Sequence, residues 1–136
     1  VKEQYKLENG KFVAPAPLEE ELKLSPFITQ SIIYGLNKKF NVALIVANMD
    51  TVKQFADEKG LTGSHAEILQ MPEIREQFKK QIVSHSTSFK NFERIENFNL
   101  LDEEWSTDNG MLTPTMKVKR SVIEEKFKEN IVSLYS

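Results

Sequence analysis

The sequence contains no cysteine, which excludes disulfide bonds, thiolate metal sites and a cysteine nucleophile. Histidine is nearly as scarce: only His65 and His85 occur, with no carboxylate at ligand spacing, so we expect no metal site. No apolar run approaches the roughly 20 residues of a membrane-spanning helix. A glycine-rich phosphate loop and a GxSxG motif are missing too. The sequence therefore lacks the common short signatures of metal, nucleotide and nucleophilic sites.

The composition is that of a globular protein, with 40% hydrophobic and 28% charged residues among 136. Lysine and arginine total 18 against 20 aspartate and glutamate, and this near-neutral balance argues against a dedicated nucleic-acid binder. We expect one domain over residues 1–136, with no repeats or linkers. The chain opens with Val1 and shows no signal peptide, so we expect an excised fragment of something larger. A processed mature protein is the alternative.

Hydrophobic periodicity and turn residues predict a small α+β fold, with an N-terminal β-hairpin and a small central sheet flanked by helices. In the hairpin, over residues 3–13, Asn9-Gly10 supplies the turn because both residues tolerate positive φ. The run 42–47 is apolar throughout, as in a strand buried on both faces. Further strands are expected at 31–35 and within 92–101. Helices are expected at 17–24, 51–59, 64–70, 72–86 and 118–135.

Two expectations concern surfaces. The acidic runs 19–21 and 103–104 are interpreted as solvated faces, and so are the charges at 124–129 on the polar side of the last helix. The buried face of that helix recurs at helical spacing. Its expected members are Val118, Val122, Phe127, Ile131 and Leu134.

One basic segment stands out near the end of the chain. Lys117, Lys119 and Arg120 place three cations within four residues, after a loop and at the start of a helix. Cations at a helix N-terminus repel the helix dipole, and an anionic partner such as a phosphate or a carboxylate would offset that cost. A solvated basic loop is the alternative. The residues alone therefore indicate an anion-contacting lysine on a loop.

These residues resemble a known family. The segment Leu112-Thr-Pro-Thr-Met-Lys117-Val-Lys119-Arg120 is similar to the closing motif of adenylate-forming enzymes, in the form used by long-chain fatty acid–CoA ligases. Other segments resemble the same family in the same order and spacing. They are Val1-Lys2-Glu3, Lys6-Leu-Glu-Asn9-Gly10-Lys-Phe-Val13-Ala-Pro15, Leu18-Glu19, Ile33-Tyr-Gly35, Lys39-Phe-Asn-Val-Ala-Leu-Ile-Val46, Phe92-Glu-Arg-Ile95, Phe98-Asn-Leu-Leu101 and Asn109-Gly110.

The resemblance implies the small C-terminal lid domain of a long-chain acyl-CoA synthetase, cut inside its hinge motif. Such an enzyme converts a fatty acid and ATP to an acyl-adenylate and pyrophosphate, and CoA then attacks to give the thioester. ATP, CoA and Mg²⁺ are implied for the whole enzyme, with none bound to the fragment. The implied partner is a large N-terminal adenylation domain of the same polypeptide. Alone, the fragment is expected to be inactive.

The resemblance assigns the catalytic role to Lys117, whose ammonium would stabilise the charge that develops when a carboxylate attacks the α-phosphate. Many relatives carry Ser-Gly before this lysine, whereas this chain carries Thr115-Met116. The substitution leaves open how freely the loop moves. Lys119 and Arg120 are expected to serve the contact between domains or to stay in solvent, with contacts to phosphate as the alternative.

The resemblance also implies a CoA-channel site in the hairpin. Gly10 matches the glycine beside the pantetheine arm, where backbone comes close to the ligand. Asn9 and Lys11 flank it, and Lys6 occupies a position where relatives often hold a lysine. Exposed amines on a plain hairpin turn are the alternative for both lysines. Lys2 matches the hinge position, with a frayed terminal lysine as its alternative.

Two rival functions remain at this point. The first is another adenylate-forming ligase that acts on medium-chain or aromatic acids, since the acyl pocket would lie outside this segment. The second is a free-standing binding module that docks a partner through the Lys117 segment. We expect an intracellular location, in the cytoplasm or on the cytoplasmic face of a membrane.

Overall fold

The computed structural model describes residues 3–136, so the expected hinge residue Lys2 lies outside the described residues. The predicted α+β class is confirmed. The strands are β1 (Tyr5–Lys6), β2 (Phe12–Val13), β3 (Ile28–Tyr34), β4 (Asn41–Ala47) and β5 (Ile95–Leu101). The helices are α1 (Pro15–Leu22), α2 (Met49–Glu58), α3 (His65–Leu69), α4 (Pro72–Ser84), α5 (Arg120–Lys126) and α6 (Lys128–Ser133), with a 3-10 turn η1 at Asn91–Glu93.

The larger sheet has the order β3-β4-β5, with β4 antiparallel to β3 and parallel to β5. Every residue of β4 is buried, which confirms the prediction of a strand covered on both faces. β3 begins at Ile28, three residues before the predicted start. The extension follows from pairing with β4, because Ile28 lies opposite Ala47 and Gln30 opposite Val46. The Gln30 side chain also donates to the Trp105 carbonyl (2.9 Å) and accepts from the Trp105 N–H (2.7 Å). No local pattern contains such a distant contact.

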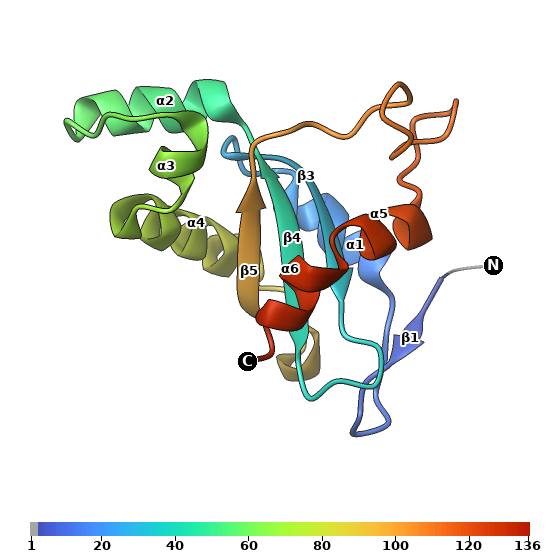
Figure 1. The fold of residues 1–136 in the computed structure, drawn as a ribbon. Helices are drawn as coiled ribbons and strands as arrows, with labels where there is room; N and C mark the ends of the chain where they lie inside the picture. The colour runs from blue at the N-terminus through green and yellow to red at the C-terminus, as the bar shows by residue number, and fades with distance from the viewer. Residues whose placement is uncertain (1–2) are drawn as a thin grey trace.

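A hydrophobic core lies on each face of this sheet. Successive β4 side chains point to opposite faces, so Ala43 and Ile45 join one core while Val42 and Leu44 join the other. The first core includes residues of the hairpin and of α1, α2, α3 and α4. The second contains α5, α6 and the loop after β5. In Figure 1, α5 and α6 lie in front of the sheet and α1 lies behind it.

Most helix starts follow from local residues. The side chain of Asn48 accepts a hydrogen bond from the Thr51 N–H at α2, and Ser64 forms a capping box at α3. α1 begins at Pro15, two residues before the predicted start. Either proline of the Ala-Pro-Ala-Pro segment tolerates the first turn of a helix, and the first of them opens it.

The single helix predicted over 118–135 is wrong. The chain forms α5 and α6, which break at Phe127, where φ is −105° and ψ is 25°. Val118 precedes α5 and pairs with Leu112 in an isolated antiparallel bridge. The inward stripe therefore begins at Ile123, which is fully buried, while Val122 is 41% exposed rather than buried.

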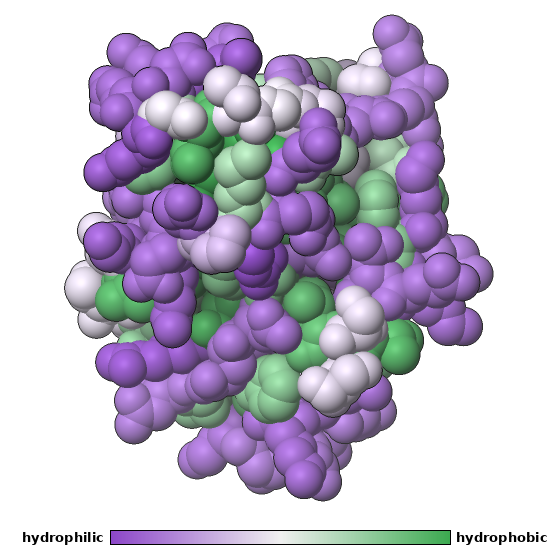
Figure 2. All heavy atoms as spheres, turned by 60° about the vertical axis from the view of Figure 1, so that its left-hand side comes forward, coloured by the Kyte–Doolittle hydropathy of each residue, from purple (hydrophilic) through white to green (hydrophobic). Residues whose placement is uncertain are grey.

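On the face in Figure 2, hydrophilic side chains cover most of the area and hydrophobic ones show between them. Within residues 3–136, no helix has the length and apolar character that crossing a membrane would require.

Candidate functional site

Lys117 lies in a tight turn, which we call the Lys117 turn (residues 113–117). The Met116 N–H donates to the Thr113 carbonyl (2.8 Å), and the Thr113 N–H donates to the Lys117 carbonyl (2.8 Å). The Thr113 hydroxyl accepts a third hydrogen bond from the Lys117 N–H (3.1 Å). These bonds enclose a three-residue loop whose last residue takes the left-handed conformation, a common hairpin geometry. The turn is therefore ordered, and Lys117 is exposed at its end.

Met116 adopts a φ of +68° and is 67% exposed. This backbone conformation favours glycine, which is the residue that many relatives are expected to carry there. A non-glycine residue in it costs roughly 1–2 kcal/mol. Met116 therefore holds this backbone conformation at some cost in stability.

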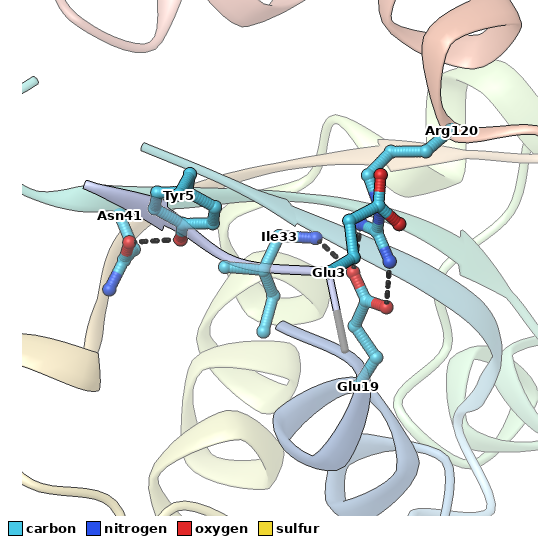
Figure 3. Close-up of polar contacts among 6 residues, drawn as sticks. All are labelled: Glu3, Tyr5, Glu19, Ile33, Asn41 and Arg120. Carbon is cyan, nitrogen blue, oxygen red and sulfur yellow. Dashed lines mark hydrogen bonds and ion pairs between the residues drawn. The ribbon is translucent and has the colours of Figure 1, made fainter. Parts of the chain in front are cut away.

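Arg120, the first residue of α5, anchors the chain just after the Lys117 turn (Figure 3). Its Nη1 and Nη2 donate to the two carboxylate oxygens of Glu19 on α1, at 2.6 and 2.7 Å. Glu19 also accepts the Ile33 N–H of β3 (2.6 Å), and the Arg120 Nε lies 3.3 Å from Glu3. The side chains of Arg120 and Glu19 are 13% and 8% exposed, so this is a buried ion pair.

This ion pair corrects two expectations. Glu19 is buried rather than part of a solvated acidic face, and Arg120 is bound within the domain rather than in solvent. Burial opposes the charge on Arg120, but the hydrogen bonds and the charge of Glu19 outweigh it and raise the pKa of the guanidinium. The predicted anion at this helix N-terminus is thus a carboxylate of the same chain. Lys117 has no ion-pair partner within residues 3–136.

An open groove of about 690 Å³ lies beside the Lys117 turn. Its lining includes residues of α1, Ser31 of β3, and Met116 and Lys117. The Ser31 hydroxyl is buried and finds no hydrogen-bond partner in the described part of the chain. Lys117 therefore stands at the edge of a concave surface.

The hairpin residues of the expected CoA site lie together in a second turn, which we call the Gly10 turn (residues 7–11). The Gly10 N–H donates to the Leu7 carbonyl and the Leu7 N–H to the Lys11 carbonyl, both at 2.9 Å. The Asn9 side chain accepts from the Lys11 N–H (2.9 Å). Gly10 has a φ of +87°, so its backbone conformation favours glycine. Lys6 precedes this turn on β1 and is exposed.

The Gly10 turn docks on the turn between β3 and β4. The Glu8 N–H donates to the Lys38 carbonyl and the Asn37 N–H to the Lys6 carbonyl, both at 2.9 Å. In Figure 1 the Gly10 turn is at the lower end of the domain and the loop with Lys117 is at the upper right. The structure thus brings Asn9, Gly10 and Lys11 together and keeps Lys117 apart from them.

Sequence reasoning missed Glu19 as part of the site. It stands in a run of three glutamates, and composition cannot distinguish them. Helical spacing could have done so, because Glu19 lies beside Leu18 and three residues before Leu22, and both leucines are buried. A polar residue on the buried side of an amphipathic helix needs a partner.

The fold is shared with solved adenylate-forming enzymes. The adenylation domain of a carboxylate reductase from Mycobacterium chelonae matches with a TM-score of 0.81 at 20% identity, over 97% of this chain and 19% of that one. Anthranilate CoA ligase AuaEII matches with a TM-score of 0.54 at 15% identity, over 90% and 19%. At these identities the likeness is one of fold alone.

The sequence then gives the family. A family model described as the AMP-binding enzyme C-terminal domain matches residues 2–136, and the chain belongs to this family. Human long-chain-fatty-acid–CoA ligase 1 is 30% identical over 135 residues, which cover 97% of this chain and 19% of that protein. Long-chain-fatty-acid–CoA ligase FadD15 of Mycobacterium tuberculosis is 33% identical over 129 residues, which cover 93% and 22%. The chain thus spans about a fifth of the length of these relatives.

Proposed function

We propose that this chain is the mobile C-terminal lid domain of a long-chain fatty acid–CoA ligase. The enzyme would join a fatty acid to the AMP part of ATP, releasing pyrophosphate, and then transfer the acyl group to the sulfur of CoA, releasing AMP. The observation that carries the proposal is Lys117, an exposed cation at the end of an ordered turn. The names of the two relatives at 30% and 33% identity support the ligase class.

The chemistry suits a lysine in this place. Attack of a carboxylate on the α-phosphate brings two anions together, and a fixed ammonium stabilises the charge added in the transition state. An ammonium donates up to three hydrogen bonds, so it can contact the carboxylate and the phosphate together. Because the turn is closed by its own hydrogen bonds, Lys117 would be delivered with little loss of backbone freedom.

The Gly10 turn would serve the second step. Gly10 has no side chain, and nothing lies within 4 Å of the place where a Cβ would stand, so the pantetheine arm of CoA can approach the backbone there. Asn9, Lys11 and Lys6 would line the approach. Since the two turns lie apart, the domain would turn on the hinge at Lys2 to present Lys117 first and Gly10 afterwards.

The cofactors divide between the two parts of the enzyme. Lys117 fits the phosphates of ATP, and the Gly10 turn fits the arm of CoA. Within residues 3–136 no group of three histidine, aspartate or glutamate side chains gathers to hold a metal ion, so no residue here is assigned to Mg²⁺. The metal, the acyl tunnel and most of the nucleotide pocket would belong to the large N-terminal domain.

The test is a lysine substitution in the full-length enzyme. Lys117→Ala should lower acyl-adenylate formation by about 10²–10³-fold, the usual effect of removing a group that stabilises transition-state charge. Thioester formation from supplied acyl-adenylate should be largely kept. Lys119→Ala is the matched control, because Lys119 is exposed, equally charged and two residues away. Equal loss in both half-reactions would overturn the role of Lys117.

A second assay tests the domain assignment. The 136-residue chain alone, given ATP, Mg²⁺, palmitate and CoA, should form no acyl-CoA. Robust product formation would contradict the lid-domain proposal and favour an autonomous enzyme.

A further inference from the structure

The buried ion pair beside the Lys117 turn has no part in the chemistry proposed above. Arg120 and Glu19 lie 101 positions apart in the sequence, yet their side chains meet through two short hydrogen bonds (Figure 3). We propose that Arg120 is a positioning residue that fixes the direction of Lys117 through Glu19. This inference rests on the proposed role of Lys117.

The two ends of the loop around Lys117 are held differently. On the near side, Met111 and Leu112 are buried in the second core, at 5% and 4% exposure. On the far side, Lys119 is exposed and Val118 is only half-buried. Arg120 is therefore the first firmly held side chain after Lys117, three residues along. Without it, the far side of the loop would depend on contacts with the near side. These are the Val118–Leu112 bridge, which consists of the hydrogen bonds from the Thr113 N–H to the Lys117 carbonyl and from the Lys119 N–H to the Met111 carbonyl, and the bond from the Lys117 N–H to the Thr113 hydroxyl.

The anchor continues into the sheet. The Glu19 oxygen that accepts from Arg120 Nη1 also accepts from the Ile33 N–H at 2.6 Å, and Ile33 is a buried residue of β3. The Glu19 carboxylate is thus held by the β3 edge of the sheet as well as by the guanidinium. A continuous chain of contacts runs from Ile33 through Glu19 to Arg120.

The chemistry of the pair explains why it sets a direction. A guanidinium is planar and presents a fork of donors, so two hydrogen bonds to one carboxylate fix both distance and angle. A lysine at the same place would supply the charge without the fork. Apolar side chains of similar volume would fill the space without selecting one orientation. The forked geometry of the pair therefore suits Arg120 to the role of holding Lys117 in one orientation.

Glu3 makes an outer contact with the same guanidinium. Its carboxylate lies 3.3 Å from Arg120 Nε and its side chain is 69% exposed. The contact joins Glu3, at the start of the described chain, to Arg120 just after the Lys117 turn. Because Glu3 is exposed to solvent, we expect its contact to hold Arg120 less firmly than either of the two hydrogen bonds to Glu19.

The experiment uses the full-length enzyme and measures the two half-reactions separately. Glu19→Gln keeps the shape of the side chain and an acceptor for the Ile33 N–H but removes the charge. Arg120→Lys keeps the charge but loses the fork. Each should lower kcat for adenylation by roughly 10- to 100-fold, as expected for a displaced catalytic group, and change thioester formation by less than about threefold. Glu20→Gln, on the neighbouring exposed residue, is the matched control.

A double variant separates positioning from general stability. If Glu19 acts through Lys117, adding Glu19→Gln to Lys117→Ala should lower adenylation no further than Lys117→Ala does alone. A fold-stabilising role predicts instead that the two losses multiply and that both half-reactions fall together. Either result would overturn the positioning role.

The outcomes also separate this inference from the proposed function. If Lys117→Ala leaves adenylation intact, the proposed function fails and the positioning role fails with it. If Lys117→Ala abolishes adenylation while Glu19→Gln and Arg120→Lys do not lower it, only the positioning role fails. Should Glu19→Gln not fold in the thermal melt of the full enzyme, Arg120→Lys decides the question alone.

Discussion

Two turns of this domain are built alike. The Gly10 turn and the Lys117 turn each enclose three residues, end on a residue with positive φ and lead directly to a lysine. The residue in the left-handed position differs: it is Gly10 in one turn and Met116 in the other. The contacts of the lysine side chain differ as well. The Lys11 ammonium lies 5.9 Å from the centre of the Phe92 ring, whereas Lys117 forms no ion pair in the described range.

The two turns also differ in what holds them. The Gly10 turn rests on neutral backbone hydrogen bonds to the turn between β3 and β4. The Lys117 turn is followed by a buried ion pair whose partner comes from the other end of the chain. Neutral contacts between adjacent hairpins tolerate small displacements, while a forked ion pair has one good geometry. The comparison teaches that equal turn geometry does not imply equal restraint.

Breaking the ion pair should have the largest effect on stability. Glu19→Ala leaves the largely buried Arg120 charge with only the exposed Glu3 beside it and removes the acceptor of the Ile33 N–H, so we expect a loss of about 3–5 kcal/mol in the free energy of unfolding. Urea unfolding of the 136-residue chain measures it. Glu20→Ala, on the exposed neighbour, should change stability by no more than about 0.5 kcal/mol. Equal effects of both substitutions would show that the pair contributes nothing beyond surface charge.

The neutral contact between the hairpin and the sheet can be tested by adding a side chain where there is no room for one. A Cβ on Gly35 would stand 2.5 Å from the Asn41 side-chain oxygen and 2.8 Å from the Tyr5 ring. Gly35→Ala should therefore cost about 1–3 kcal/mol, because the hairpin must move away from the sheet. The urea midpoint of this variant measures the cost. An unchanged midpoint would mean that the hairpin shifts freely on its neighbour.

The hydroxyl of Tyr5 gives the same region a pH dependence. Tyr5 donates to the Asn41 side chain, and burial raises the pKa of its hydroxyl well above the ordinary value of 10.0. Since the folded pKa is the higher one, its contribution to stability is complete below pH 10 and is lost as the pH rises above it. We expect Tyr5 to account for a loss of about 1.4 kcal/mol by pH 11.

Tyr5→Phe isolates this contribution. Burial also raises the pKa of Tyr34 and Tyr135, and both groups are present in both chains. The stability difference between the original chain and Tyr5→Phe should therefore shrink as urea midpoints are taken from pH 9 to pH 11. A difference that stays constant over that range would contradict the assignment.

Local sequence signals predicted much of this fold. The Asn9-Gly10 turn, the apolar run of β4 and the helix that ends near Gly60 each depend on neighbouring residues, and each was predicted near its place. The long last helix failed because the chain breaks at Phe127, and its start was predicted too early because Val118 pairs with Leu112. The pairing of Val118 with Leu112 closes the Lys117 turn, and helical spacing gives no sign of it.

Sequence reasoning likewise found part of the candidate site and missed the rest. Family resemblance led to Lys117 and Gly10, and the structure gives each of them a tight turn. The ion pair was beyond sequence reasoning, because its two members lie 101 positions apart and each stands among residues of like charge. Their association depends on α1 and α5 meeting at the edge of β3, which only the assembled sheet determines.

The smallest effects are expected at Gly10 and Met116, the residues with positive φ in the two turns, where opposite substitutions can be compared. Gly10→Ala forces a side chain into positive φ and should cost about 1 kcal/mol. Met116→Gly relieves the same strain, but the added freedom of glycine in the unfolded chain offsets part of the gain, so we expect a stabilisation of about 0.5 kcal/mol. Met116 is 67% exposed, so little packing is lost with its side chain. Urea unfolding of both variants should give opposite signs. If Met116→Gly destabilises the chain instead, the methionine side chain stabilises its turn through contacts, and the two turns are less alike than their hydrogen bonds suggest.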